Sequence, residues 1–310
     1  MRLILPILAT LVLAGCNPED FGPSDRYKDD FHYTLKPSER FSIEDFNGDV
    51  EIAGWDQPSI EITGTKYAST EENLRQIKVD VHESPSLTEI RTSHPTTFHG
   101  NQGARFFIQA PRKTVIERAS SSNGKVRIHD MTAGARIHTS NGAINVENTT
   151  GGVNADTSNG AIELDTVAGK LKLKTSNGRI HAEEITGACE AETSNGPVNL
   201  NFKDAADGPL HIHTSNGSVE LTFPKSPKSE INAETSNGSI TLNLPGGTSA
   251  HLNAHTSGSS VSSDFDVTDR DSPDKQKHNL EGNIGAGGPL IELSTHNGGI
   301  HVKKTSASAN

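Results

Sequence analysis

Aromatic side chains and cysteines are scarce in this 310-residue chain. Phe, Trp and Tyr make up 5% of the residues, and all hydrophobic types together make up 32%. The two cysteines are Cys16 and Cys189. So few large side chains argue against a thick globular core, and two cysteines exclude a disulfide framework or a cysteine-based zinc site. Gly, in contrast, contributes 29 residues, which suits many short strands joined by tight turns.

The chain also lacks an excess of positive charge. It has 28 Lys and Arg against 39 Asp and Glu, which gives a net charge of −11. This balance argues against a nucleic-acid partner and against electrostatic docking on anionic lipid. The sequence contains no Walker loop, no G-x-S-x-G motif and no zinc-ribbon spacing, so none of these motifs predicts an enzyme.

The N-terminus has the pattern of an export signal. Residues 3–13 form an apolar run that follows Arg2 and is too short to span a bilayer permanently. The stretch Leu13-Ala14-Gly15-Cys16 resembles the lipobox of bacterial lipoproteins. This resemblance implies cleavage just before Cys16, which removes residues 1–15, and lipidation of Cys16. Removing residues 1–15 removes Arg2 and no acid, so the charge of −11 becomes −12. We expect a lipid-anchored protein of the bacterial envelope, with residues 16–30 as a polar tether.

A Ser-Asn-Gly sequence recurs along most of the chain. The first five copies are separated by 18 residues and the next two by 21, and a final copy with His in place of Ser closes the series. A fixed period of this size indicates a stacked array of similar units. The Asn-Gly pairs are Asn123-Gly124, Asn141-Gly142, Asn159-Gly160, Asn177-Gly178, Asn195-Gly196, Asn216-Gly217, Asn237-Gly238 and Asn297-Gly298.

Hydrophobic residues alternate on both sides of each Asn-Gly pair. Ile162 and Leu164 follow one pair, and Leu171 and Leu173 precede the next. Alternation with period two indicates strands with one buried face, and like positions would stack ~4.8 Å apart from one period to the next. The sequence therefore predicts an all-β fold, a parallel β-solenoid (β-helix) with coils of 18–21 residues. We expect it to be right-handed, as parallel crossovers are.

In this fold the repeated Thr-Ser-Asn-Gly sequence is predicted to be a corner. Thr157 and Thr175 share the parity of the inward residues, and Asn and Gly both tolerate the positive φ that a tight corner can require. Stacked Asn side chains can hydrogen-bond from coil to coil. Cys189 falls in the same inward column as Val153 and Leu171, so we expect it to fill the core.

The ends of the chain are less regular. Residues 31–118 are rich in strand patterns and are expected to cap the regular solenoid, which is expected over 119–303. A short helix is predicted after Ser69, with a capping box to Glu72. The polar segment 266–281 is expected to be a loop insertion, and residues 304–310 a tail.

Outward positions form columns of charged residues. One column predicted by the period contains His138, Asp156, Lys174, Glu192, His213, Glu234 and His255, and a neighbouring column contains Arg136, Asn154, Lys172, Glu190 and His211. Alternating charge on adjacent strands favours a ladder that fixes the coil register. An alternative is a metal site of His213, Glu234 and His255, although three ligands strung along ~10 Å fit one ion poorly. We therefore expect neither a metal nor a cofactor.

A catalytic alternative rests on a group of acids. Glu147, Glu163, Asp165 and Glu183 fall on neighbouring coils, and some β-helix proteins are polysaccharide lyases or hydrolases. However, acids are also what the outer face of a soluble solenoid contains, and the sequence shows no basic groove for an acidic polysaccharide. We therefore expect no catalytic residues.

Three stretches together resemble one known family. They are "NGDVEIAGWD" at 47–56, the T-S-N-G-x-[IV] coils, and "LEGNIGAGGPLIELSTHNGGIHV" at 280–302. The chain is similar to the DUF4097 family of bacterial cell-envelope β-solenoids, whose members are often labelled adhesins. The resemblance implies no catalytic residues. With the lipobox, it implies a non-catalytic, membrane-anchored, adhesin-like lipoprotein that presents an extended face to an envelope polymer or protein.

Overall fold

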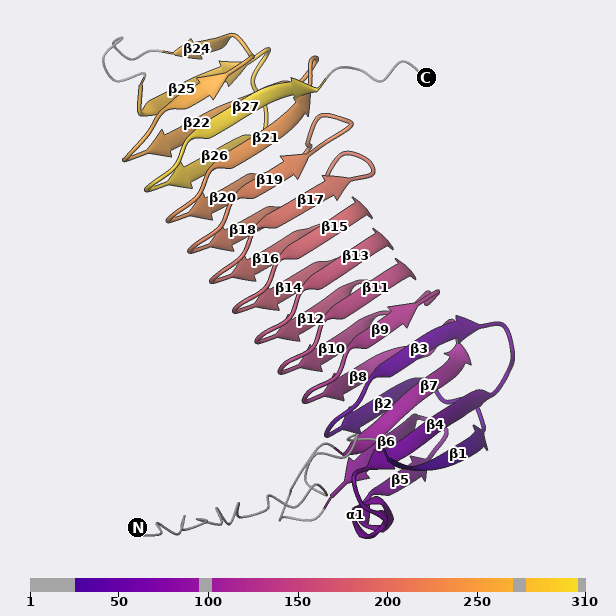
Figure 1. The fold of residues 1–310 in the computed structure, drawn as a ribbon. Coiled ribbons are helices and arrows are strands. Elements are labelled where there is room, and N and C mark those ends of the chain that lie inside the picture. The colour runs from indigo at the N-terminus through magenta and orange to yellow at the C-terminus, as the bar shows by residue number, and fades with distance from the viewer. Residues whose placement is uncertain (1–25, 95–101, 270–276, 306–310) are drawn as a thin grey trace, which may run out of the picture.

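The computed structural model describes residues 26–94, 102–269 and 277–305. The chain forms two long sheets whose strands are mostly parallel, stacked face to face along an elongated body (Figure 1). Sheet A has 13 strands in the order β1-β4-β7-β3-β9-β11-β13-β15-β17-β19-β21-β27-β23. Sheet B has 14 strands in the order β24-β25-β22-β26-β20-β18-β16-β14-β12-β10-β8-β2-β6-β5. The predicted all-β parallel solenoid is confirmed.

Each regular coil contributes one strand to sheet B and the next strand to sheet A. Like residues of consecutive coils lie opposite one another, as Leu171 does with Cys189. The coils are β8 (Val115–Ser121) with β9 (Val126–His129), β10 (Ala135–Thr139) with β11 (Ile144–Thr149), β12 (Val153–Thr157) with β13 (Ile162–Val167), β14 (Leu171–Thr175) with β15 (Ile180–Ile185), β16 (Cys189–Thr193) with β17 (Val198–Phe202), β18 (Leu210–Thr214) with β19 (Val219–Thr222), and β20 (Ile231–Thr235) with β21 (Ile240–Pro245).

The N-terminal region belongs to the same two sheets. The pair β2 (Arg40–Asp45) and β3 (Val50–Trp55) is a coil, and β8 and β9 stack directly on it. The pair β6 (Leu87–Ser93) and β7 (Gly103–Pro111) lies on its other side. The expected boundary at residue 118 falls within β8, which pairs with β2 on one side and β10 on the other, so the irregular region and the regular solenoid share the same two sheets.

Antiparallel strands close this end of the molecule. The strands β1 (Tyr27–Leu35) and β4 (Ile60–Ala68) extend sheet A, and β5 (Lys78–Glu83) extends sheet B. Since β1 begins at Tyr27, the expected tether over 16–30 is too long, and its residues 16–25 lie outside the described residues.

One short helix accompanies these strands. It is α1 (Glu71–Gln76), and its N-cap is Thr70, whose hydroxyl accepts a hydrogen bond from the backbone N–H of Asn73 at 3.2 Å. The predicted capping box was placed one residue too early. No helix in the described part of the chain is long and apolar enough to cross a membrane.

At the C-terminal end the order of coils departs from the order of the sequence. The last coil, β26 (Leu290–Thr295) with β27 (Ile300–Thr305), lies between the β20/β21 coil and the β22/β23 coil (Ala250–Thr256 and Val261–Ser263). Figure 1 shows the yellow β26 and β27 next to the orange β20 and β21. At the two ends of the segment 266–281, which was expected to be a loop, β24 (Val267–Asp269) and the beginning of β25 (Asn279–Ile284) form antiparallel strands that end sheet B. The middle of that segment, 270–276, lies outside the described residues.

Inward side chains of the two sheets form one main core, and a second, small cluster of Ala68, Leu74 and Ile77 lies beside it. Leu171 and Leu173 are 0% and 1% exposed, in agreement with the predicted parity. Cys189 is a free, buried thiol, and burial raises its pKa to about 12. A thiol that stays protonated in the core is a packing group, so the interpretation of Cys189 as core filler is confirmed.

The Thr-Ser-Asn-Gly corners pack backbone against backbone. A Cβ added to the corner glycines from Gly124 to Gly298 would fall 1.7–2.1 Å from the carbonyl oxygen of the corner glycine in the coil on which each stacks. None of these eight described glycines has a positive φ, and neither do the corner asparagines. The predicted reason for glycine, positive φ, is therefore wrong. Glycine is needed because any side chain would collide with the neighbouring coil.

Positive φ occurs instead at the other end of each coil, at or just beyond the last residues of the sheet A strands. Four non-glycine residues at intervals of 18 adopt it, namely Asp130, Asn148, Thr166 and Glu184, with φ between 47° and 61°. Such values are uncommon outside glycine, most of all for β-branched Thr166. The chain crosses from sheet A back to sheet B just after these residues.

Candidate functional site

The repeated corners form two continuous hydrogen-bond ladders. Each corner Asn from Asn141 onward donates from its Nδ2 to the Oδ1 of the Asn below it, over 2.8–2.9 Å, and the series ends with Asn297 on Asn237. Each inward Thr donates to the corner-glycine carbonyl of the coil below, as Thr157 does to Gly142 at 3.0 Å. These bonds give Asn and Thr a structural role in every coil. Cys16 lies outside the described residues.

The outward face of sheet B carries the predicted charge ladder. His138, Asp156, Lys174, Glu192, His213 and Glu234 occupy successive strands in one column. Lys174 lies 2.9 Å from Glu192, and His138 and His213 each lie 3.6 Å from the acid on the next strand.

Hydrogen bonds along this ladder and along the neighbouring column shift the pKa values of exposed partners. The bond to Glu192 raises the pKa of Lys174, and the bond from Lys172 lowers the pKa of Glu190. Exposed pairs of this kind contribute ~1 kcal/mol or less each. Because opposite charges attract and like charges repel when they face each other on adjacent strands, the alternation along the column favours one strand register over the others. The ladder therefore contributes more to the choice of register than to overall stability.

The metal-site hypothesis does not fit the coil order. Glu234 faces Ser294, and His255 lies one strand farther away, beyond Ser294. His255 hydrogen-bonds Asn279 instead. Among the residues that the structure describes, no three His, Cys, Asp or Glu side chains gather in a way that could hold an ion. The expectation that His255 lies beside Glu234 is wrong, because the last coil of the sequence is inserted between them.

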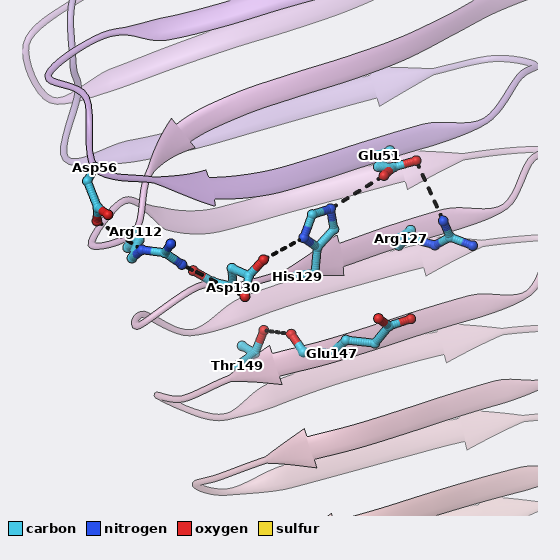
Figure 2. A network of polar contacts seen from close by, with 8 residues as sticks. All are labelled: Glu51, Asp56, Arg112, Arg127, His129, Asp130, Glu147 and Thr149. Carbon is cyan, nitrogen blue, oxygen red and sulfur yellow. Dashed lines mark hydrogen bonds and ion pairs between the residues drawn. The ribbon is translucent and has the colours of Figure 1, made fainter.

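On sheet A a polar network connects the β2/β3 coil to the β8/β9 coil that stacks on it. Figure 2 shows Glu51 of β3 facing Arg127 and His129 of β9, at 3.8 and 3.4 Å. His129 Nδ1 also lies 2.9 Å from Asp130 Oδ2. This hydrogen bond is the main reason that the pKa of Asp130 is lowered.

The same network reaches the turn that follows β7. Arg112 Nε lies 2.9 Å from Asp56, and its Nη1 donates to the backbone carbonyl of Asp130 at 2.8 Å (Figure 2). Residues from three segments that are far apart in sequence are thus held together. Every charged group of this network has an opposite charge close by. The network therefore links neighbouring coils through ion pairs and hydrogen bonds.

The acids singled out in the sequence lie farther along sheet A. Glu147 faces Asp165, which in turn faces Glu183. Glu163 is paired with Arg179, and His181 lies 3.2 Å from Glu183. They border a shallow hollow of about 270 Å³. Glu147, Asp165 and Glu183 follow one column and Glu163 lies in the next, so all four project from the same face of sheet A. A glycosidase instead places two carboxylates on opposite sides of the bound sugar.

A basic hollow lies on sheet B, where the sequence predicted none. It has a volume of about 510 Å³, and its lining includes Arg136, Asn154, Lys170 and Lys172. The expectation that no basic groove exists is therefore wrong. The cations come from β10, from β14 and from the corner that precedes β14. The contribution of Lys170 was missed because it lies outside the two outward columns read from the sequence.

Near the N-terminal end one acid is buried. Asp45 is 5% exposed and occupies the inward corner position that Ser121 and Thr139 fill in the next coils. Its Oδ1 accepts a hydrogen bond from Thr92 at 2.6 Å, and its Oδ2 has no partner among the described residues. Burial raises the pKa of Asp45 to about 7.

Several solved bacterial structures are similar to this chain along most of its length. A proposed adhesin of Parabacteroides distasonis shares 10% identity, with 90% of this chain and 98% of that chain covered and a TM-score of 0.43. A proposed adhesin of Bacteroides fragilis shares 12%, with 90% and 99% covered and a TM-score of 0.40. A proposed lipid-binding protein of Parabacteroides distasonis shares 14%, with 91% and 98% covered and a TM-score of 0.43. With TM-scores below 0.5, we take no property of these proteins over to this chain.

Family membership rests on the sequence itself. No curated protein matches the chain. The sequence profile of the family described as Toastrack DUF4097 matches residues 38–244, which is more than half of the chain and covers the coils from β2 to β21. This protein therefore belongs to the Toastrack DUF4097 family.

Proposed function

We propose that this protein is a non-catalytic, membrane-anchored lipoprotein of the bacterial cell envelope, with an adhesin-like role. In this proposal its solenoid presents an extended face to an envelope polysaccharide or protein. The observation that carries the proposal is the shape of the molecule: two sheets of 13 and 14 strands with long outward faces. Solenoids of this kind bind partners along extended surfaces.

The distribution of side chains supports a role at the surface of the solenoid. Large apolar side chains fill the space between the sheets, so the interior holds packed side chains where an enclosed ligand site would have to be. Polar and charged side chains occupy the outward columns, and three large hydrophobic residues are exposed in the described ranges: Phe107, Val115 and Leu290. The outward columns are therefore the surfaces available to a partner.

The anchor is tested separately from the binding role. In the Cys16→Ala variant we expect the protein to be extracted from membranes without detergent, because it lacks the lipidated residue. If this variant partitions with membranes as the parent does, the lipoprotein part of the proposal is wrong.

The binding role is tested by affinity capture from the native envelope. The acylated protein is incubated with detergent-solubilised envelope, and retained polysaccharide and protein are both identified. We expect one component to be retained by the parent and lost when outward charged residues of one sheet are neutralised. Retention of nothing above a control bearing an unrelated lipoprotein would contradict the proposal.

A further inference from the structure

We propose that the hollow around Arg136 on sheet B binds the carboxylates of an acidic polysaccharide, a polymer of uronate sugars. This inference rests on the proposed function and specifies its partner. Four features of the hollow carry it: two exposed cations that form no ion pair, an interruption of the column that contains Arg136, a β-bulge, and a lining that is partly apolar.

Charges around the hollow are paired, with two exceptions. Lys172 lies 2.8 Å from Glu190, and Glu117 lies 2.8 Å from Arg40. Within the described ranges, neither Arg136 nor Lys170 has an ion pair, although both are exposed and line the hollow. Glu117 also lines the hollow, and Glu190 interacts electrostatically with Lys170 without forming an ion pair with it. A cation that forms no ion pair at a concave site still attracts anions.

The column that contains Arg136 is interrupted at the same place. Arg136 faces Asn154, and Asn154 faces Lys172, so a neutral amide lies between two cations where an alternating ladder would have an acid. The two cations are separated by two strand spacings of ~4.8 Å each. A polymer with a negative charge on each sugar could place carboxylates near both, with the Asn154 amide between them as a hydrogen-bond donor.

A β-bulge adjoins Arg136 on the neighbouring strand. The register of β8 shifts between Ile116 and Ala119 relative to β10, and the shift makes both Glu117 and Arg118 exposed. The two residues then pair with Arg40 and Glu44 across β2. Bulges often redirect side chains beside binding sites, and here the bulge directs the nearest acid to Arg40 and leaves Arg136 without a partner.

Closely packed glycines form one edge of the hollow, since a Cβ on Gly151 or Gly152 would fall 2.7–2.8 Å from the backbone of a neighbouring coil. Gly151 and Gly152 line it and have φ values of 94° and 89°, which other residues rarely adopt. Apolar atoms of Val153 and of the exposed Val115 also line it. An apolar floor with cations at its rim fits the C–H face of a pyranose ring carrying a carboxylate better than it fits a chain of phosphodiesters.

The overall charge of the protein predicts how this binding depends on salt. With a net charge of −11, long-range repulsion of a polyanion opposes the local attraction. At physiological ionic strength the Debye length is ~8 Å, so distant acids are screened while contacts within the hollow persist. We therefore expect binding at physiological ionic strength, and weaker binding when salt is raised further.

The test is a calorimetric titration of the full chain with polygalacturonate, and with polyphosphate and a neutral glucan as comparison polymers. We expect polygalacturonate to bind, and Arg136→Gln to weaken its Kd at least about tenfold, the loss that corresponds to one charge-assisted contact. Lys170→Gln should also weaken the binding of polygalacturonate. The matched control is Lys303→Gln, an exposed residue of β27 on sheet A, which changes the net charge equally. It should leave the Kd within twofold.

Three outcomes would overturn the inference. They are no binding of polygalacturonate by the parent, equal weakening by Arg136→Gln and Lys303→Gln, and equal or tighter binding of polyphosphate. If the uronate polymer fails to bind while affinity capture from the envelope still retains a partner, this inference fails and the proposed function stands. If neither experiment finds a partner, both fail.

Discussion

Gly160 packs so closely on Gly142 that a Cβ added to it would lie 1.8 Å from the Gly142 carbonyl oxygen. Because the obstacle is backbone, it cannot move aside as a flexible side chain would. We expect Gly160→Ala to lower the free energy of unfolding by at least ~3 kcal/mol, measured by denaturant unfolding.

The control for this prediction is Gly246→Ala. Gly246 has open space around the position of a Cβ and no positive φ. This substitution should change the free energy of unfolding by less than ~0.5 kcal/mol. Equal losses at the two positions would show that close stacking of coils is not the reason for glycine at the corner.

The asparagine ladder gives a second prediction. Asn177 donates to Asn159 and accepts from Asn195, each over 2.8 Å. Asn177→Ala removes both bonds and should cost ~1–2 kcal/mol of stability in thermal or denaturant unfolding. Ser176→Ala, at the exposed neighbouring position, should cost less than ~0.5 kcal/mol. A loss at Asn177 no larger than that at Ser176 would mean that water replaces the ladder at no cost.

Asp45 predicts a pH dependence of stability. Its pKa is raised from 3.8 to about 7 in the folded state, mainly because burial disfavours the carboxylate. The folded protein therefore holds a proton that the unfolded chain has lost at pH 5–7, and stability falls as pH rises from about 4 to about 7. One pKa unit corresponds to ~1.4 kcal/mol, so the decrease could reach ~4 kcal/mol.

The variant Asp45→Thr isolates this contribution. It places at Asp45 the residue type that Thr139 contributes at the same position two coils later. Denaturant unfolding at pH 5 and pH 8 should show a larger advantage of the variant over the parent at pH 8. Asp80→Asn, at an exposed position of β5, should show no such change with pH. The same advantage at both pH values would mean that Asp45 is not the titrating group.

The position of the β26/β27 coil predicts which neighbouring coil unfolds when this coil is destabilised. Leu293 is 1% exposed in β26, which pairs with β20 on one side and β22 on the other. In Leu293→Asp a buried unpaired charge should open this coil and also separate the β22/β23 coil from the stack. Amide hydrogen exchange should therefore lose protection over 250–263 as well as 290–305, while 198–222 stays protected. If 250–263 keeps its protection, the coils are stacked in sequence order instead.

The local sequence repeat was enough to predict which residues of the regular coils are buried and which positions stack on one another. The alternation around Leu171 and Leu173 set the parity, and the 18-residue spacing placed Cys189 above Leu171, because each coil buries the same positions against its neighbours. The resemblance to the DUF4097 family was available for the same reason, since its motifs are short and contiguous. The charge columns up to Glu234 also followed from the period alone.

The order of the end coils was decided by pairing between distant segments. One coil of a repeat can stack on any other with the same period, so the sequence spacing that links Glu234 to His255 did not determine contact. The asparagine ladder shows the physical reason for the observed order. The coil that carries Asn297 continues the ladder from Asn237, whereas the coil with Ser257-Gly258 has no Asn and lies beyond it.

What the sequence determined by itself is the repeating coil: its two strands, its buried positions and its glycine-dependent corner, because these depend on residues close together in the chain. Only the tertiary structure decided which coils are neighbours at each end, and which charges remain unpaired. Arg136 and Glu117 illustrate this, since the bulge in β8 and the ion pair with Arg40 separate two residues that could otherwise have neutralised each other. Such pairing depends on backbone register across strands, and a register shift of one residue redirects every side chain beyond it.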